Sequence, residues 1–293
     1  MSSETDRETF GREFRLSPTT RSFVYKFGVY ASAALIVAII AFPLYWMAQS
    51  AFIESQALLG HVSYFPTPDT FSLERFDVLN RSDVQGYLLN SVIVTIGTIV
   101  TVVVISLIAG YGLARFDFKH KVTFARFLLL GYVFSPIVLA LPLFMIWKTL
   151  GLYNTHLGLI LALSAISMPF AVWLMWKYIQ TIPRSMEESA WTAGASRWRG
   201  FIDVVLPQTK PAIIANALFS FAIAWNDFTF AQILLPRTDA TTFPVGLLQL
   251  VNTGYATGPG QFLAAGVLVT LPPLLFAYFL QSYMLKGFQI RAL

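Results

Sequence analysis

The sequence contains no cysteine, few histidines and little charge. Its 293 residues include 3 His and only 12% charged residues, about half the charged share of an average soluble domain. Without cysteine the fold has no disulfide and no thiolate metal site, and His61, His120 and His156 are too isolated to form a metal site. Hydrophobic residues make up 56% of the chain. The composition therefore excludes an ordinary soluble domain and indicates a chain whose main solvent is the lipid bilayer.

Motifs for catalysis and nucleotide binding are also missing. The chain has no Gly-x-x-x-x-Gly-Lys-Ser/Thr loop, no His-Glu-x-x-His and no Gly-x-Ser-x-Gly. Its apolar runs hold one acidic residue, Asp227, and no Lys or Arg well inside them, whereas proton relays and ion pumps usually need several buried ionisable groups. We therefore expect a non-catalytic chain, without a cofactor of its own, that is passive or takes its energy from a partner. An autonomous secondary transporter or channel is a disfavoured alternative, since the chain also lacks an inverted repeat.

Long apolar runs predict six membrane-spanning helices. The runs cover roughly residues 27–49, 87–113, 124–148, 156–179, 211–235 and 262–285. Each exceeds the about 20 residues that a helix needs to cross the hydrocarbon, and each should be helical because lipid cannot satisfy a bare backbone. The first run is longer than the core of a signal peptide, so we expect it to be retained. The predicted fold class is an all-α integral membrane protein.

The positions of Lys and Arg predict the orientation of these spans. With the N-terminal segment 1–26 in the cytoplasm, 16 of the 20 basic residues lie on the cytoplasmic side. This asymmetry predicts a multi-pass protein of the cytoplasmic (inner) membrane with both termini inside. The basic residues lie beside apolar runs, so we expect no nucleic-acid partner. The same topology places a charged insert, residues 181–211, in the cytoplasm.

The insert predicts two short helices. Ser185-Met-Glu-Glu188 has capping-box spacing, in which the Ser185 hydroxyl accepts from the amide of Glu188. The two acids then lie in the first turn, where the helix dipole favours negative charge, and Gly194 ends the helix. Ser196 can start the second helix, which we expect to end at Pro207 and Pro211.

A plain loop on the membrane surface is the alternative to a docking element. Two acids at a helix start would be repelled by an anionic surface, however, and Gly194 and Ala195 are small enough for another backbone to approach closely. These features favour the docking of a partner.

The insert also resembles a known motif. Glu188-Ser-Ala, three residues, Gly194, nine residues and Val204-Val-Leu-Pro207 resemble the EAA loop of binding-protein-dependent ABC importer permeases. That loop reads Glu-Ala-Ala, three residues, Gly, nine residues, Ile-x-Leu-Pro. Ala193 departs from the Asp that commonly precedes the Gly.

Other stretches resemble the carbohydrate branch of the family, and within it the six-span permease of the maltose-transporter type. They are Asn90-Ser, Ala109-Gly-Tyr-Gly-Leu-Ala-Arg-Phe, Pro142-Leu, Leu150-Gly-Leu-Tyr-Asn-Thr, Ile182-Pro-Arg-Ser-Met-Glu-Glu and Trp225-Asn-Asp-Phe. The resemblance covers roughly residues 27–288. The ending Lys286-Gly-Phe-Gln-Ile-Arg-Ala-Leu departs from the Gly/Ala-rich ending common in the family, and we assign residues 289–293 to a C-terminal tail.

This resemblance implies a type I ABC importer permease over residues 27–288. The implied partners are a second permease, two ATPase subunits that bind ATP and Mg, an extracytoplasmic solute-binding protein, membrane lipid and a sugar. The insert would fit a groove of one ATPase subunit. The implied coupling residues are Ser185, Met186, Glu187, Glu188, Ala190, Trp191, Gly194, Ala195, Leu206 and Pro207.

The outer half of the fifth span is the candidate substrate pathway. Aromatic rings beside an amide and a carboxylate suit the apolar face and the hydroxyls of a sugar. The candidate contacts are Trp225, Asn226, Asp227 and Phe228, with Asn90 and Tyr132 as further candidates. The alternative is that Trp225 and Phe228 serve helix packing or the interfacial belt, and that Asp227 caps a helix or pairs with the second permease.

The sequence leaves more than one class of solute open. The near absence of basic residues in the spans favours a neutral sugar or oligosaccharide. A uronic-acid oligosaccharide stays open if Lys148, Arg237 or the second permease supplies positive charge. The alternative within the same family is a permease for glycerol phosphate, a polyamine or a peptide.

Overall fold

The computed structural model describes residues 18–53, 71–73, 76–77, 80–133, 135–236, 239–252 and 259–289. Residues 1–17 of the N-terminal segment and 290–293 of the tail lie outside these ranges. Within the described residues the regular structure is helical, apart from one isolated antiparallel bridge between Ile53 and Phe71. The predicted all-α class is confirmed.

Four of the predicted spans are single helices. The helices are α1 (Pro18–Ala51), α3 (Ser82–Arg115), α4 (Lys121–Leu130), α5 (Pro136–Leu150), α6 (His156–Ile179), α7 (Arg184–Thr192), α8 (Arg197–Gly200), α9 (Leu206–Gln208), α10 (Lys210–Trp225), α11 (Thr229–Leu234), α12 (Phe243–Asn252) and α13 (Pro259–Gln289). By length and composition, α1, α3, α6 and α13 can cross a membrane.

The third and fifth predicted spans are helical, but each is divided between two helices. The third consists of α4, a 3-10 turn at Gly131–Val133, and α5. Ser135 has φ −62° and ψ 135°, the extended conformation that a following proline favours. The fifth consists of α10 and α11, with residues 226–228 between them.

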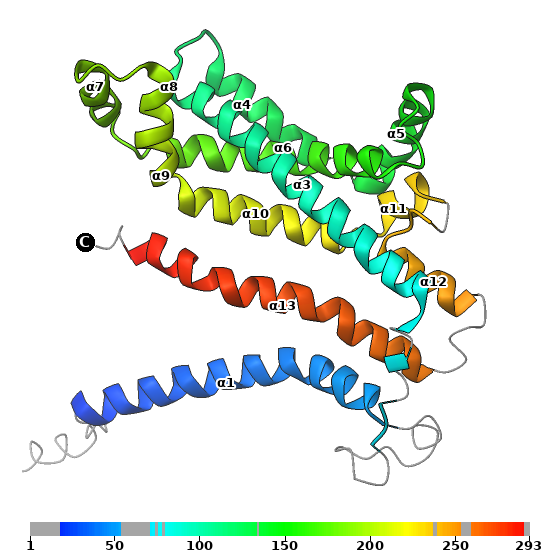
Figure 1. Ribbon diagram of the computed structural model, residues 1–293. Helices are drawn as coiled ribbons and strands as arrows, with labels where there is room; N and C mark the ends of the chain where they lie inside the picture. The colour runs from blue at the N-terminus through cyan, green and yellow to red at the C-terminus, as the bar shows by residue number, and fades with distance from the viewer. Residues whose placement is uncertain are drawn as a thin grey trace, which may run out of the picture.

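The bundle is built around α3, α6 and α10, with α13 beside α10 and α1 alongside α13 (Figure 1). On α3, Gly97 meets Ile160 and Gly110 meets Met175, so residue numbers rise together and α3 and α6 run in the same direction. A Cβ on Gly110 would lie 2.8 Å from Met175 and 2.9 Å from the backbone nitrogen of Trp176. Glycine therefore allows the two helices their close approach.

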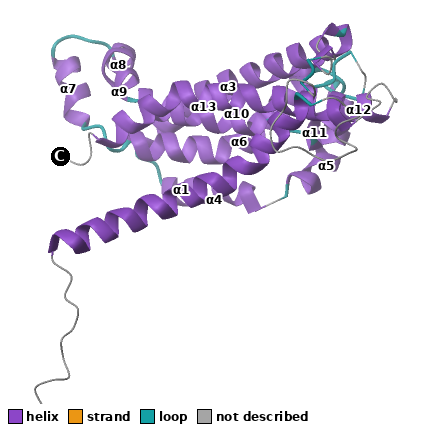
Figure 2. Ribbon diagram, turned by 90° about the horizontal axis from the view of Figure 1, so that it is seen from below, coloured by secondary structure: helices purple, strands orange, loops and turns teal. Residues whose placement is uncertain are grey.

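The helices of the insert and the helices next to the interrupted spans lie at opposite ends of the bundle. α7 and α8 project at one end, whereas α5, α11 and α12 lie at the other (Figures 1 and 2). One apolar cluster joins α3 and α6 to the insert and includes Met175, Phe201 and Val205. A second joins α5, α6 and α11 and includes Leu163 and Phe230. The insert is thus part of the packed bundle rather than a loop lying beside it.

A buried amide ties the three central helices together. Asn216 on α10 is fully buried, and its Nδ2 donates to Ser106 Oγ at 3.1 Å and to the carbonyl of Ala171 at 3.0 Å. Ser106 lies on α3 and Ala171 on α6. In a bilayer, such hydrogen bonds between helices add to the packing of small residues.

Candidate functional site

The first helix of the insert, α7, ends as the sequence predicts. Gly194 has φ +92°, its N–H donates to the carbonyl of Trp191, and the N–H of Ala195 donates to the carbonyl of Ala190, each at 3.0 Å. These two bonds form a Schellman motif, which satisfies the last carbonyls of the helix. The predicted C-cap at Gly194 is confirmed.

The start of α7 differs from the prediction. The helix begins at Arg184, directly after Pro183, and Ser185 lies in its first turn rather than at the cap. The carbonyl of Ser185 accepts a hydrogen bond from Ser189 Oγ at 2.8 Å, and the N-cap position makes no side-chain bond. The predicted capping box at Ser185 is therefore wrong, because Pro183 starts the helix earlier than the capping pattern indicated.

The second helix of the insert starts where predicted but does not stop at Pro207. Ser196 Oγ accepts from the N–H of Arg199 at 3.2 Å, which confirms the N-cap. The chain then passes through a π turn, Phe201–Val205, into α9. Pro207 lacks an N–H and its ring would crowd the carbonyl four residues earlier, and the wider π turn directly before it relieves this conflict.

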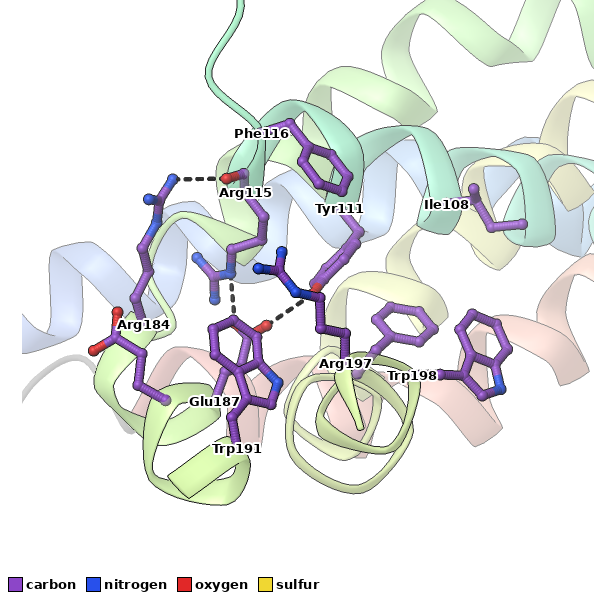
Figure 3. A pocket seen from close by; sticks show the side chains of 11 residues that line it. Ile108, Tyr111, Arg115, Phe116, Arg184, Glu187, Trp191, Arg197 and Trp198 are labelled. Carbon is purple, nitrogen blue, oxygen red and sulfur yellow. Dashed lines mark hydrogen bonds and ion pairs between the residues drawn. The ribbon is translucent and has the colours of Figure 1, made fainter. Parts of the chain in front are cut away.

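Glu187 faces into the bundle and binds the end of α3 (Figure 3). Its side chain is 1% exposed and that of Arg115 is 9% exposed. Arg115 Nε donates to Oε1 at 2.5 Å, and the Tyr111 hydroxyl donates to Oε2 at 2.9 Å. Arg115 also donates through Nη2 to the carbonyl of Ile182 at 3.1 Å. We call Glu187, Arg115 and Tyr111 the α3 tie.

Sequence reasoning missed two members of this tie. Both residues belong to the family-like stretch from Ala109 to Phe116, and membrane orientation alone accounts for a basic residue at Arg115. Tyr111 and Arg115 are four residues apart, so they share a face at the end of a span. That spacing was the available signal, but the sequence does not show that this face meets α7.

The adjacent Glu188 is not part of the α3 tie. Glu188 and Gly194 are exposed, and Met186 is 44% exposed. Trp191 is half-buried, and the Arg197 guanidinium lies 5.3 Å from the centroid of its ring. Of the other predicted coupling residues, Ser185 and Pro207 are exposed and Ala190, Ala195 and Leu206 are half-buried.

A pocket of about 310 Å³ lies between the insert and α3 (Figure 3). It is lined by Ile108, Tyr111, Arg115, Phe116, Arg184, Glu187, Glu188, Trp191, Arg197, Trp198 and Phe201. At its rim Arg184 donates to the carbonyls of Ala114 and Arg115, each at 3.1 Å. Next to it, a hydrogen bond from Lys121 holds the pKa of the Asp117 carboxyl below its usual value. The insert is thus fixed to α3 by a buried contact and by surface contacts.

A second pocket, of about 490 Å³, lies near the opposite end of the bundle and brings together four predicted substrate contacts. Tyr132, Asn226, Asp227 and Phe228 all line it. The first comes from the turn between α4 and α5, and the others from the break between α10 and α11. The interruptions of the third and fifth spans therefore meet at one pocket, and discontinuous helices are typical of solute sites in transporters.

The two remaining candidates lie elsewhere. Trp225 is 4% exposed, and its Nε1 donates to the carbonyl of Val269 on α13 at 3.0 Å. Asn90 is 7% exposed, and its Nδ2 donates to the carbonyls of Asp239 and Thr241, each at 3.0 Å. Neither residue lines the second pocket, and their geometry favours a packing role.

Residues 102–289 match the family of binding-protein-dependent transport system inner membrane components. The chain belongs to this family. It is therefore a non-catalytic, multi-pass component of the inner membrane, and the resemblance drawn from residues 188–207 is confirmed. Membership also argues against an autonomous secondary transporter.

Two sugar-transport permeases align with about nine-tenths of this chain. The trehalose/maltose transport system permease protein MalG of Thermococcus litoralis is 31% identical over 265 residues, which are 89% of this chain and 94% of that protein. The diacetylchitobiose uptake system permease protein NgcG of Streptomyces coelicolor is 29% identical over 267 residues, or 90% of this chain and 88% of that protein.

A solved structure has the same fold. One chain of a bacterial ABC transporter involved in the import of the acidic polysaccharide alginate superposes with a TM-score of 0.76 at 19% identity. The match covers 92% of this permease and 98% of that chain. The predicted type I ABC importer permease fold is confirmed.

Proposed function

We propose that this permease carries a neutral sugar or oligosaccharide into the cytoplasm, as one of two permease subunits of an ABC importer. A solute-binding protein delivers the sugar from outside, and two ATPase subunits drive the change between outward-facing and inward-facing states. ATP and Mg bind to those ATPase subunits, and this chain needs no cofactor of its own. Both termini and the insert lie in the cytoplasm.

The observation that carries the coupling role is the different burial of two adjacent acids on α7. Glu187 is buried in the α3 tie, whereas Glu188 and Gly194 are exposed. A coupling element must be held firmly by its own bundle and still present a free face to the ATPase. α7 has both properties.

The second pocket supports a neutral solute. Its described lining residues include rings, amide and hydroxyl groups and one carboxylate, but no Lys or Arg. An acidic sugar or a sugar phosphate would meet Asp227 without a cation among these described lining residues. The curated relatives are named for trehalose, maltose and diacetylchitobiose, which are uncharged. The alginate transporter is only 19% identical, so it supports the fold of this chain and not the choice of solute.

The test is ATPase stimulation of the complete transporter in proteoliposomes with its own solute-binding protein. The panel contains neutral di- and oligosaccharides, uronic-acid oligosaccharides, glycerol phosphate, a polyamine and a peptide. We expect stimulation and uptake with a neutral sugar only. Stimulation by a charged solute alone would overturn the assignment of a neutral substrate, and uptake without any ATPase subunit would overturn the coupling role.

A further inference from the structure

The break between α10 and α11 interrupts the backbone hydrogen bonds of a membrane-spanning segment. α10 ends at Trp225 and α11 begins at Thr229, so the carbonyls that end one helix and the N–H groups that begin the next lose their helical partners. Lipid cannot supply replacements, and non-helical backbone is tolerated only where protein or a water-filled cavity satisfies it. The groups that do so here are two neighbouring side chains.

Asn226 serves the end of α10. Its Nδ2 donates to the carbonyl of Ala222 at 2.9 Å, which lies in the last turn of that helix. With φ −91° and ψ 1°, Asn226 has left the helical conformation while its side chain reaches back to the helix. Its amide hydrogen thus replaces a backbone donor that the break removes.

Asp227 serves the start of α11. Its Oδ1 accepts from the N–H of Phe230 at 3.3 Å and its Oδ2 accepts from the N–H of Ala231 at 2.9 Å. The formal N-cap residue, Phe228, makes no side-chain cap. Both carboxylate oxygens are therefore engaged by backbone donors, as in an N-cap.

We propose that Asn226 and Asp227 are a pair of positioning residues that build this break, and that neither is a ligand of the solute. By closing α10 and opening α11, the pair positions two rings of the wall of the second pocket. Both Phe228 and Phe230 line this pocket, Phe228 with 40% of its surface exposed and Phe230 with 1%. Loss of the cap at Asp227 would free the first turn of α11 and alter this wall.

The charge of Asp227 is then incidental, and its oxygen acceptors are what matter. Serine and asparagine also cap helices well, whereas alanine does not. A ligand that needs a carboxylate would instead reject serine as strongly as alanine. The two roles therefore differ in their response to Asp227→Ser.

The chain contains no cysteine, so a single Thr229→Cys substitution reports on the pocket wall. In the assembled transporter, we would measure the rate at which a small thiol reagent labels this position with Asp227, Asp227→Ser, Asp227→Asn or Asp227→Ala. Gln232→Ala is the matched control, because Gln232 is an exposed side chain on the same helix. We expect alanine to raise the labelling rate about two- to thirtyfold, the range that loss of a cap gives. Serine, asparagine and the control should stay within about twofold of the parent.

The proposal rests on the proposed function only for its transport readout, in which serine and asparagine should keep uptake and alanine should lose it. The labelling rate does not depend on the solute. It therefore still tests the positioning role if no transported sugar is found. Unchanged labelling in Asp227→Ala would overturn the positioning role, and so would Asp227→Ser behaving like alanine in both assays. If Asp227→Ala cannot be assembled, the serine variant decides, because the proposal requires it to assemble and transport.

Discussion

Replacing Glu187 by alanine should release the insert from the bundle, whereas the same change at Glu188 should not. The two residues are adjacent glutamates on one short helix, so they form a matched pair. Only Glu187 belongs to the α3 tie, where its carboxylate meets Arg115 and Tyr111. The comparison therefore isolates burial and pairing from charge alone.

The expected magnitude follows from the burial of the pair. With exposures of 1% for Glu187 and 9% for Arg115, the substitution leaves a nearly buried guanidinium without its carboxylate. Removing one partner of a buried ion pair typically costs about 3–5 kcal/mol. At about 1.4 kcal/mol for each factor of ten, even the lower value shifts the equilibrium between attached and detached insert by about 100-fold. Glu188→Ala is a surface change and should alter stability by no more than about 0.5 kcal/mol.

The assay is the solute-stimulated ATPase rate of the reconstituted transporter, measured together with uptake and thermal unfolding. We expect Glu187→Ala to lower the unfolding temperature and to lose stimulation while the ATPase subunits still hydrolyse ATP at the unstimulated rate. Glu188→Ala should keep the unfolding temperature and weaken association with the ATPase subunits. Glu187→Gln, which keeps two polar acceptor or donor sites, should fall between the parent and alanine.

Two outcomes would refute the reasoning. In one, Glu187→Ala unfolds at the parent temperature and keeps full ATPase stimulation, which would mean that the α3 tie contributes neither to stability nor to coupling. In the other, Glu187→Ala and Glu188→Ala behave alike, so the difference in burial between the two acids would have no functional consequence. Arg115→Gln provides an independent check, because it removes the same pair from the α3 side and should reproduce the defect.

Further substitutions test other contacts. Gly194→Ala meets open space but must hold φ +92°, so it should cost about 1–2 kcal/mol and reduce coupled ATPase activity, with Gly194→Asn milder. Gly110→Ala places a Cβ 2.8 Å from Met175 and should cost about 1–3 kcal/mol in thermal unfolding by separating α3 from α6. Asn216→Leu removes the buried bonds between three helices and should cost about 0.6–2 kcal/mol by the same measurement. Asp117→Asn loses only surface pairs with Lys121 and Arg184, so uptake should match the parent at neutral pH.

Hydropathy predicts where this chain crosses the membrane, but not where a span is interrupted. The turn before α5 coincides with Pro136, yet Pro43, Pro142 and Pro169 lie inside α1, α5 and α6 without dividing them. In a membrane protein, neighbouring helices and local adjustments satisfy the groups that a proline releases, so proline alone does not mark a break. The position of the interruption depends on packing, which the sequence does not display.

The candidate site was predictable to the extent that its contacts are local. The C-cap at Gly194 and the N-cap at Ser196 depend on residues within five positions, and both follow from sequence spacing. The α3 tie joins residues that are 72 and 76 positions apart, and the sequence of neither segment indicates that the two come into contact. Asp227 is intermediate, because its capping bonds are local but an isolated acid in an apolar run fits a cap and a ligand equally well.

The connectivity of the insert links the two pockets mechanically. α6 enters the insert at Ile179, and its residues Leu163 and Ile166 line the second pocket, about 20 Å back along the helix from Ile179 to Ile166. α10 leaves the insert at Lys210, reaches the same pocket at Phe219 after about 14 Å, and ends at the break after about 24 Å. Both helices are uninterrupted over these lengths and are joined by the Asn216 bond. A displacement of the insert must therefore bend one of these two helices or move a wall of the second pocket.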